Sequence, residues 1–70
     1  MQTKGIVLSK LAQVLKRLQC DAQEFADEAG VTRTMVQRAL EGHGCFQKTL
    51  ERYAHAAGKP NVYEFLKEAI

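Results

Sequence analysis

Apolar residues recur along this chain at intervals of three and four, the spacing that lines one face of an α-helix. The first series consists of Leu8, Leu11, Leu15 and Leu18, and it predicts an amphipathic helix over roughly residues 6–19. The opposite face of that helix carries basic side chains that form either an ordinary solvated surface or contacts with phosphate groups, namely Lys10, Lys16 and Arg17.

Residues 21–42 predict two short helices joined by a tight turn. Asp21 is the expected N-cap of the first helix, because its carboxylate can accept from the free amides of the first turn, and Glu24 completes a capping box. Gly30 is expected to end this helix, since a residue without a Cβ adopts the left-handed conformation at little cost. Thr32 is the expected N-cap of the second helix.

The second helix, expected over residues 32–41, has two contrasting faces. Its apolar residues predict an inward stripe made of Met35, Val36, Ala39 and Leu40. The opposite face is polar and rich in hydrogen-bonding groups, and it consists of Arg33, Thr34, Gln37, Arg38 and Glu41. Such residues are ordinary on any solvated helix, so their position in the fold decides whether they have a role.

Two more helices are expected after the loop Gly42-His43-Gly44. The glycines of this loop either form a plain sharp turn or allow the backbone to come close to another group. The fourth helix is closed by Gly58 and Pro60, and its apolar stripe is Phe46, Leu50, Tyr53, Ala54 and Ala57. The fifth helix starts at an N-cap with a capping-box spacing, Asn61 and Glu64, and its apolar residues are Val62, Phe65, Leu66, Ala69 and Ile70.

The pattern therefore predicts an all-α fold, a compact five-helix bundle in a single domain of 70 residues. Residues 1–4 are expected to form a loose N-terminal arm, with contact to DNA as the alternative. No apolar run approaches the roughly 20 residues of a membrane span, and no secretory signal is recognisable, so we expect a cytoplasmic protein without a membrane partner. Cys20 and Cys45 are expected to be separate reduced thiols, and the spacing of His43 and His55 gives no reason to expect a metal site.

The formal charge of +2 is too small to indicate a nucleic-acid binder by itself, but its distribution is uneven. Residues 1–19 contain four basic and no acidic residues, and residues 20–31 contain four acidic and no basic ones. Basic residues again prevail over residues 32–52, which include the second helix of the pair. If this helix contacts DNA, the acidic residues before it are expected to point mostly away from the phosphates.

The residues of the helix pair resemble the helix-turn-helix unit of phage repressor and Cro-like proteins, the lambda-repressor-like domains. Ala26 allows the second helix to approach, Gly30 makes the turn, and Val36 fills the gap between the helices. The resemblance is strong over residues 21–42 and looser over the rest of residues 8–70. It departs at Ala22, where these repressors often have a glutamine that contacts the DNA backbone, and Gln23 follows one place later.

The resemblance implies a sequence-specific regulator whose second motif helix lies in the major groove of double-stranded DNA. The expected base contacts are made by arginine, glutamine and threonine side chains, which suit guanine, adenine and thymine edges, namely Arg33, Thr34, Gln37 and Arg38. The expected phosphate contacts are Gln23, Thr32, His43, Gly44, Gln47 and Lys48.

One copy of so small a module makes few phosphate contacts, so we expect a homodimer, a Cro-like repressor on a palindromic operator. The last helix either closes the core or supplies the dimer surface through Tyr63, Phe65, Leu66 and Ile70. The competing hypothesis is a helical protein-interaction module or antitoxin-like partner without DNA readout. We expect no enzyme, cofactor or small-molecule ligand, since no catalytic constellation or phosphate-binding loop is recognisable.

Overall fold

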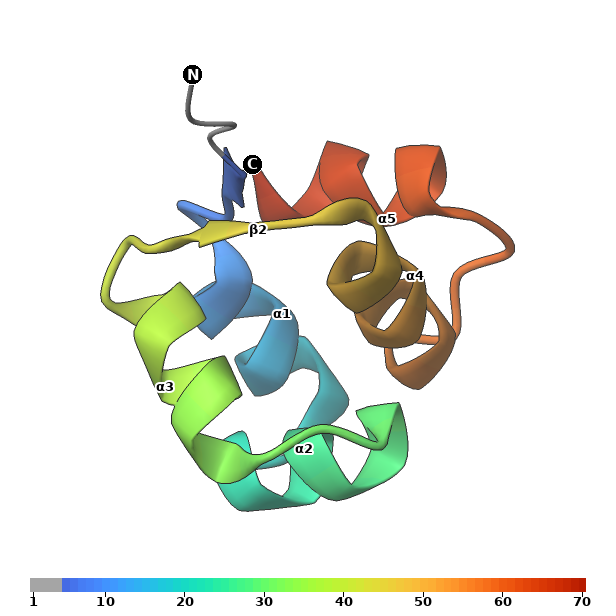
Figure 1. The fold of residues 1–70 in the computed structure, drawn as a ribbon. Coiled ribbons are helices and arrows are strands. Elements are labelled where there is room, and N and C mark those ends of the chain that lie inside the picture. The colour runs from blue at the N-terminus through green and yellow to red at the C-terminus, as the bar shows by residue number, and fades with distance from the viewer. Residues whose placement is uncertain (1–4) are drawn as a thin grey trace.

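The computed structural model describes residues 5–70, which form a mostly helical fold with a small two-stranded sheet (Figure 1). The expected arm at residues 1–4 lies outside the described residues. In chain order the elements are β1 (Ile6–Val7), α1 (Leu11–Leu18), α2 (Ala22–Ala29), α3 (Arg33–Leu40), β2 (Gly44–Cys45), α4 (Gln47–Ala56) and α5 (Val62–Ala69).

The first element within residues 5–70 is a strand, which corrects the prediction of a helix over residues 6–19 and of a purely helical fold. Strand β1 pairs antiparallel with β2, with Ile6 opposite Cys45 and Val7 opposite Gly44. Helix α1 starts only at Leu11, where the backbone amide of Lys10 donates to the carbonyl of Ala69 at 2.7 Å. The helical spacing of the leucines extends back to residue 8, but the strand partner lies far along the sequence, so no local pattern reveals it.

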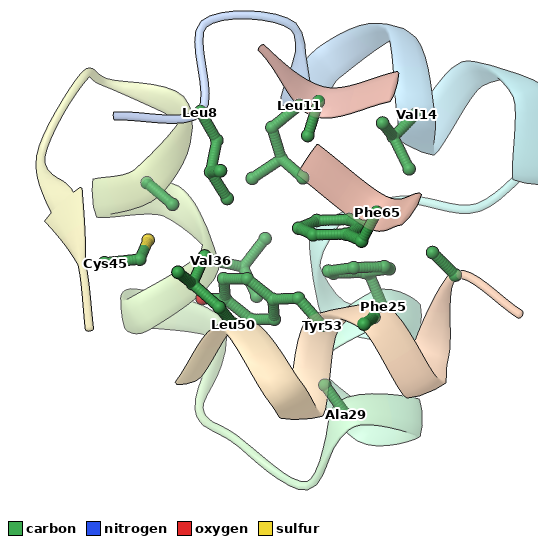
Figure 2. Close-up of a cluster of buried hydrophobic side chains, with 14 of the residues drawn as sticks. Leu8, Leu11, Val14, Phe25, Ala29, Val36, Cys45, Leu50, Tyr53 and Phe65 are labelled. Atoms are coloured by element: carbon green, nitrogen blue, oxygen red, sulfur yellow. The ribbon is translucent and has the colours of Figure 1, made fainter. Parts of the chain in front are cut away.

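An aromatic cluster occupies the centre of the core (Figure 2). The ring of Tyr53, on α4, packs against those of both Phe25 and Phe65, at centroid distances of 5.3 and 6.4 Å. Helices α1 and α3 add Leu11, Val14 and Val36, which are all fully buried. Burial of such side chains contributes roughly 1.5 to 3 kcal/mol each, so this cluster holds the helices in one arrangement.

Helix α5 lies against both α1 and α4 and divides its apolar residues between the core and the surface (Figure 1). Phe65 and Ala69 are fully buried, whereas Tyr63 is 68% exposed and Ile70 is 48% exposed. The expectation that Phe65 contributes to a dimer surface is therefore corrected, because its ring packs inside the monomer. Leu66 is partly buried against the core.

Helices α1 and α5 are also joined by a polar contact. The guanidinium group of Arg17 donates to both carboxylate oxygens of Glu68 and, at 3.1 Å, to the carbonyl of Ala57. Lys59 lies 3.6 Å from the same carboxylate. Arg17 therefore has a structural partner, which favours the fold over a phosphate as the reason for its place on α1.

No helix within residues 5–70 has the length and apolar character needed to cross a membrane.

Candidate nucleic-acid interface

The connection between α2 and α3 is fixed by the local residues that the sequence singles out. The carboxylate of Asp21 accepts from the Glu24 amide at 2.8 Å, and the Glu24 carboxylate accepts from the Asp21 amide at 3.0 Å, so the capping box is confirmed. Gly30 is confirmed as the left-handed residue that ends α2, with φ of 71°. Thr32 is confirmed as the N-cap of α3, and its Oγ1 accepts from the Met35 amide at 3.2 Å.

In its capping bond the Thr32 hydroxyl acts only as an acceptor, so its proton is not used in that bond. Thr32 is exposed, so the same side chain can cap α3 and donate to a phosphate oxygen. The structure thus accommodates both roles assigned to Thr32.

Helix α3 is held to the core by Val36 and Ala39, which are buried. The inward stripe is narrower than the sequence predicts, because Met35 is 39% exposed and Leu40 is 37% exposed, a correction to both positions. An eight-residue helix that packs mainly against α2 has room for only one buried row. Met35 and Leu40 flank that row instead of extending it.

The polar face of α3 is exposed to solvent. Its four candidate base-reading side chains are exposed, and within residues 5–70 none of them forms a side-chain hydrogen bond or ion pair that would have to break before contact with DNA. They are Arg33, Thr34, Gln37 and Arg38.

Two candidate phosphate ligands are, by contrast, already engaged. The amide of Gln23 donates to Asp27 at 2.9 Å, and that of Gln47 donates to Glu51 at 3.1 Å. Both bonds are exposed pairs four residues apart on one helix, which contribute only about 0.2 to 0.5 kcal/mol. They can be exchanged for a phosphate contact at small cost.

Two further candidates, His43 and Gly44, lie beside Arg38 at the C-terminal half of α3. Arg38, His43 and Gly44 line one open cleft of about 510 Å³ between α3, β1, β2 and the start of α4. Gly44 also pairs with Val7 in the sheet, and a Cβ on Gly44 would lie 2.8 Å from the backbone of Gly5. The strand that Gly44 approaches closely is therefore β1 of the same chain, which accounts for this glycine without a DNA strand.

Lys48 lies apart from that cleft, in a groove between the C-terminal end of α2 and helix α4. Two acidic residues of α2, Asp27 and Glu28, line the same groove together with Arg52 and His55. The groove is of mixed charge, and Lys48 forms no ion pair with these acids in the described part of the chain. The carboxylates weaken the attraction of this groove for phosphate, since their negative charge partly cancels the positive charge of Lys48 and Arg52.

The two cysteines are free thiols, as expected from the sequence. Cys45 is buried on β2 beside Tyr53, and burial raises the pKa of its thiol above the ordinary value. Burial also raises the pKa of Cys20, and the nearby carboxylates of Glu24 and Asp21 act in the same direction. Neither thiol is therefore activated towards nucleophilic chemistry at neutral pH.

Sequence reasoning misses two apolar residues of this surface, Met35 and Phe46. Phe46 is expected in the buried stripe of the fourth helix, but it is the N-cap residue of α4 and is 56% exposed. Phe46 precedes the first helical residue, Gln47, and a residue before the helix does not follow the spacing of the helix's apolar face. This position is the local feature of the sequence that could have indicated its exposure.

Within residues 5–70, no group of three or more histidine, cysteine, aspartate or glutamate side chains is arranged to hold a metal ion.

No protein-family model, curated protein or solved structure matches the chain.

Proposed function

We propose that this chain is a sequence-specific double-stranded DNA-binding protein with a lambda-repressor-like arrangement of its five helices. In this proposal α2 and α3 form the helix-turn-helix unit, and α3 enters the major groove. The observation that carries the proposal is the polar face of α3, where Arg33, Gln37 and Arg38 are exposed and unengaged within the described residues. An α-helix with such side chains fits the major groove and can bond base edges.

The assigned roles follow from chemistry. Arg33 or Arg38 donates two bonds to guanine O6 and N7, Gln37 pairs with adenine, and Thr34 contacts thymine or a base-edge acceptor. Thr32, Gln23, His43, Gly44, Gln47 and Lys48 position the protein on phosphates.

A homodimer on a palindromic operator, acting as a Cro-like repressor, is the form of the function that this proposal favours. Two copies related by a twofold axis would read half-sites about 34 to 36 Å apart. The apolar residues of α5 and its C-cap that remain for such an interface are the exposed Tyr63 and Ile70 and the partly buried Leu66, at steps of three and four on one helical face. Phe65 has no part in it.

A helical protein-interaction module is the second candidate, and the observations that favour it are the exposed Phe46 and Tyr63 together with the acidic α2. Exposed aromatic residues are typical of protein interfaces.

Selection of bound sequences from a random duplex pool, followed by titration of the selected duplex with salt, separates the two candidates. The DNA-binding proposal predicts an enriched palindromic site and a log–log salt slope of about −0.9 for each phosphate contacted. Recovery of no preferred sequence, together with an affinity that is flat in salt, would refute it and favour the interaction module.

A further inference from the structure

Met35 is an apolar side chain on α3, the helix that the proposed function assigns to the major groove. It is 39% exposed, and it lines the cleft beside α3 together with Arg38. Residues three apart on a helix are surface neighbours, with Cβ atoms about 5 to 6 Å apart. The thioether chain of Met35 therefore lies next to a side chain that is a candidate for base readout.

The charge around this cleft favours the approach of DNA. Arg38 supplies positive charge and His43 a further hydrogen-bonding group, and no acidic residue is among the described residues that line the cleft. The groove between α2 and α4, by contrast, is lined by three acidic residues, Asp27, Glu28 and Glu51. A duplex can therefore come close to the cleft side of α3 without repulsion from carboxylates in its lining.

The cleft also has exposed apolar surface that phosphate contacts do not use. Val7, Met35 and Phe46 line it and are 47%, 39% and 56% exposed. Of these three residues, only Met35 belongs to α3. In the major groove, the apolar group that a base edge offers is the C5-methyl group of thymine. Met35 is thus the apolar side chain of this surface for which the major groove holds a matching partner.

The spacing of bases in DNA suits a joint contact by Met35 and Arg38. Arg38 can donate two hydrogen bonds to guanine O6 and N7. Neighbouring bases of one strand are about 3.4 Å apart along the helix axis, which is less than the separation of the two Cβ atoms. With Arg38 on a guanine, the unbranched and flexible Met35 side chain can therefore reach the base beside it.

We propose that Met35 reads the C5-methyl group of a pyrimidine beside the guanine that Arg38 contacts. The pyrimidine is thymine in unmodified DNA, and 5-methylcytosine offers the same methyl group, so methylation of a cytosine at this position strengthens binding. This inference rests on the proposed function and names a feature of the DNA site. The sequence favours a core position for Met35, because it follows the apolar spacing of α3, and only the folded chain exposes it beside Arg38.

Substituted duplexes test the methyl group alone. Selection from a random pool gives the preferred site, and Arg38→Ala identifies the guanine in question, because the variant relaxes the preference there. A thymine should adjoin that guanine. Its replacement by deoxyuridine, which removes only the methyl group, should weaken wild-type binding about three- to five-fold. At the same position, 5-methylcytosine should bind more tightly than cytosine by a similar factor.

Variants test the assignment to Met35. Met35→Ala should bind the thymine and deoxyuridine duplexes equally, with an affinity near that of the wild type for deoxyuridine. Leu40→Ala is the matched control, because Leu40 also lies on α3 and is 37% exposed, but is not among the described residues that line the cleft. It should keep the wild-type difference between the two duplexes. Thr34→Ser, which removes the other methyl group assigned to thymine, should also keep the difference at this position.

Three results would overturn the role of Met35 in reading the methyl group. One is equal wild-type affinity for the thymine and deoxyuridine duplexes, and another is a selected site with no thymine on either side of the guanine. The third is a Met35→Ala variant that weakens binding to both duplexes but keeps their difference, which would be a structural effect on α3. Loss of the difference in Phe46→Ala but not in Met35→Ala would assign the methyl contact to Phe46 instead and would equally refute the proposal.

The same experiment distinguishes failure of this inference from failure of the proposed function. No enriched site, together with an affinity that is flat in salt, would refute both. An enriched site with salt-dependent affinity that does not respond to the methyl group would refute this inference alone and leave the proposed function standing.

Discussion

Gly5 and Gly44 face each other so closely that a Cβ added to Gly5 would lie 2.5 Å from the backbone nitrogen of Cys45, and one added to Gly44 would lie 2.8 Å from the backbone of Gly5. This contact joins the start of the described chain to the loop that leaves α3. It therefore fixes one wall of the cleft beside Arg38 and His43.

Gly44→Ala should destabilise the protein by about 1 to 3 kcal/mol, because the two strands must separate to admit the methyl group. Urea denaturation measures this loss. Gly58→Ala is the informative comparison, since its Cβ would meet nothing within 4 Å among the described residues and its cost comes from a φ of 75°. If Gly44→Ala kept wild-type stability and lost only DNA affinity, the glycine would serve DNA approach and not strand pairing.

Gln19→Gly should stabilise the protein by roughly 0.5 to 1 kcal/mol. Gln19 ends α1 with φ of 55° and ψ of 43°, a left-handed conformation that is unfavourable for a residue with a Cβ. The same denaturation experiment measures the gain, with Gln13→Gly, inside α1, as the control that should lose stability. A loss at both positions would show that flexibility of the unfolded chain outweighs the relief of strain at Gln19.

Tyr53→Phe should leave the stability at neutral pH unchanged or slightly raised, because it removes a buried hydroxyl without a partner within residues 5–70. The wild type should lose stability as the pH rises from about 10 towards 12. The pKa of Tyr53 is raised from 10 to about 12, so in this window the unfolded chain has released a proton that the folded chain still holds. The variant should lack this component, which unfolding curves at pH 7 and pH 11 reveal as a difference between the two proteins.

Glu68→Gln should cost about 0.5 to 1 kcal/mol at neutral pH, a modest value because Arg17 and Glu68 are both partly exposed. The hydrogen bond from Arg17 lowers the pKa of Glu68, with Lys59 adding to the effect. The contribution is therefore present above the ordinary carboxyl pKa and is lost as the pH falls through the lowered one. Glu64→Gln, which removes a more exposed pair with Lys67, is the matched control and should change stability less.

Arg38→Ala and Lys48→Ala should weaken DNA binding in different ways. Loss of a base contact at Arg38 should cost about 1 to 3 kcal/mol on the selected site and relax the base preference there. Loss of a phosphate contact at Lys48 should weaken binding to all sequences alike and reduce the salt slope by about one. Fluorescence anisotropy with selected and random duplexes measures both effects.

Glu28→Gln is the companion variant for Lys48, since both residues line the groove between α2 and α4. Removal of its charge should strengthen binding to random duplex if phosphates lie near that groove. Wild-type affinity in Arg38→Ala and Lys48→Ala would argue against the assigned DNA contacts.

The sequence by itself determined the parts of the molecule that depend on neighbouring residues. The helix caps and the turn involve groups only a few residues apart, so a short stretch of sequence is enough to predict them. The caps are Asp21, Thr32 and Asn61, and the turn is at Gly30. The exposed polar face of α3 followed from the same periodicity.

Only the tertiary structure decided the rest. The pairing of Ile6 with Cys45 depends on a partner distant in sequence. The apolar spacing near residue 8 is compatible both with this strand and with an α1 that starts earlier, so the local pattern does not choose between them. Whether an apolar residue is core or surface depends on which neighbours cover it, so Phe65 is buried while Met35 and Phe46 are exposed. That the Tyr53 hydroxyl has no hydrogen-bond partner within residues 5–70 is a property of packing alone, because no sequence pattern states which donors remain without a partner once the core has formed.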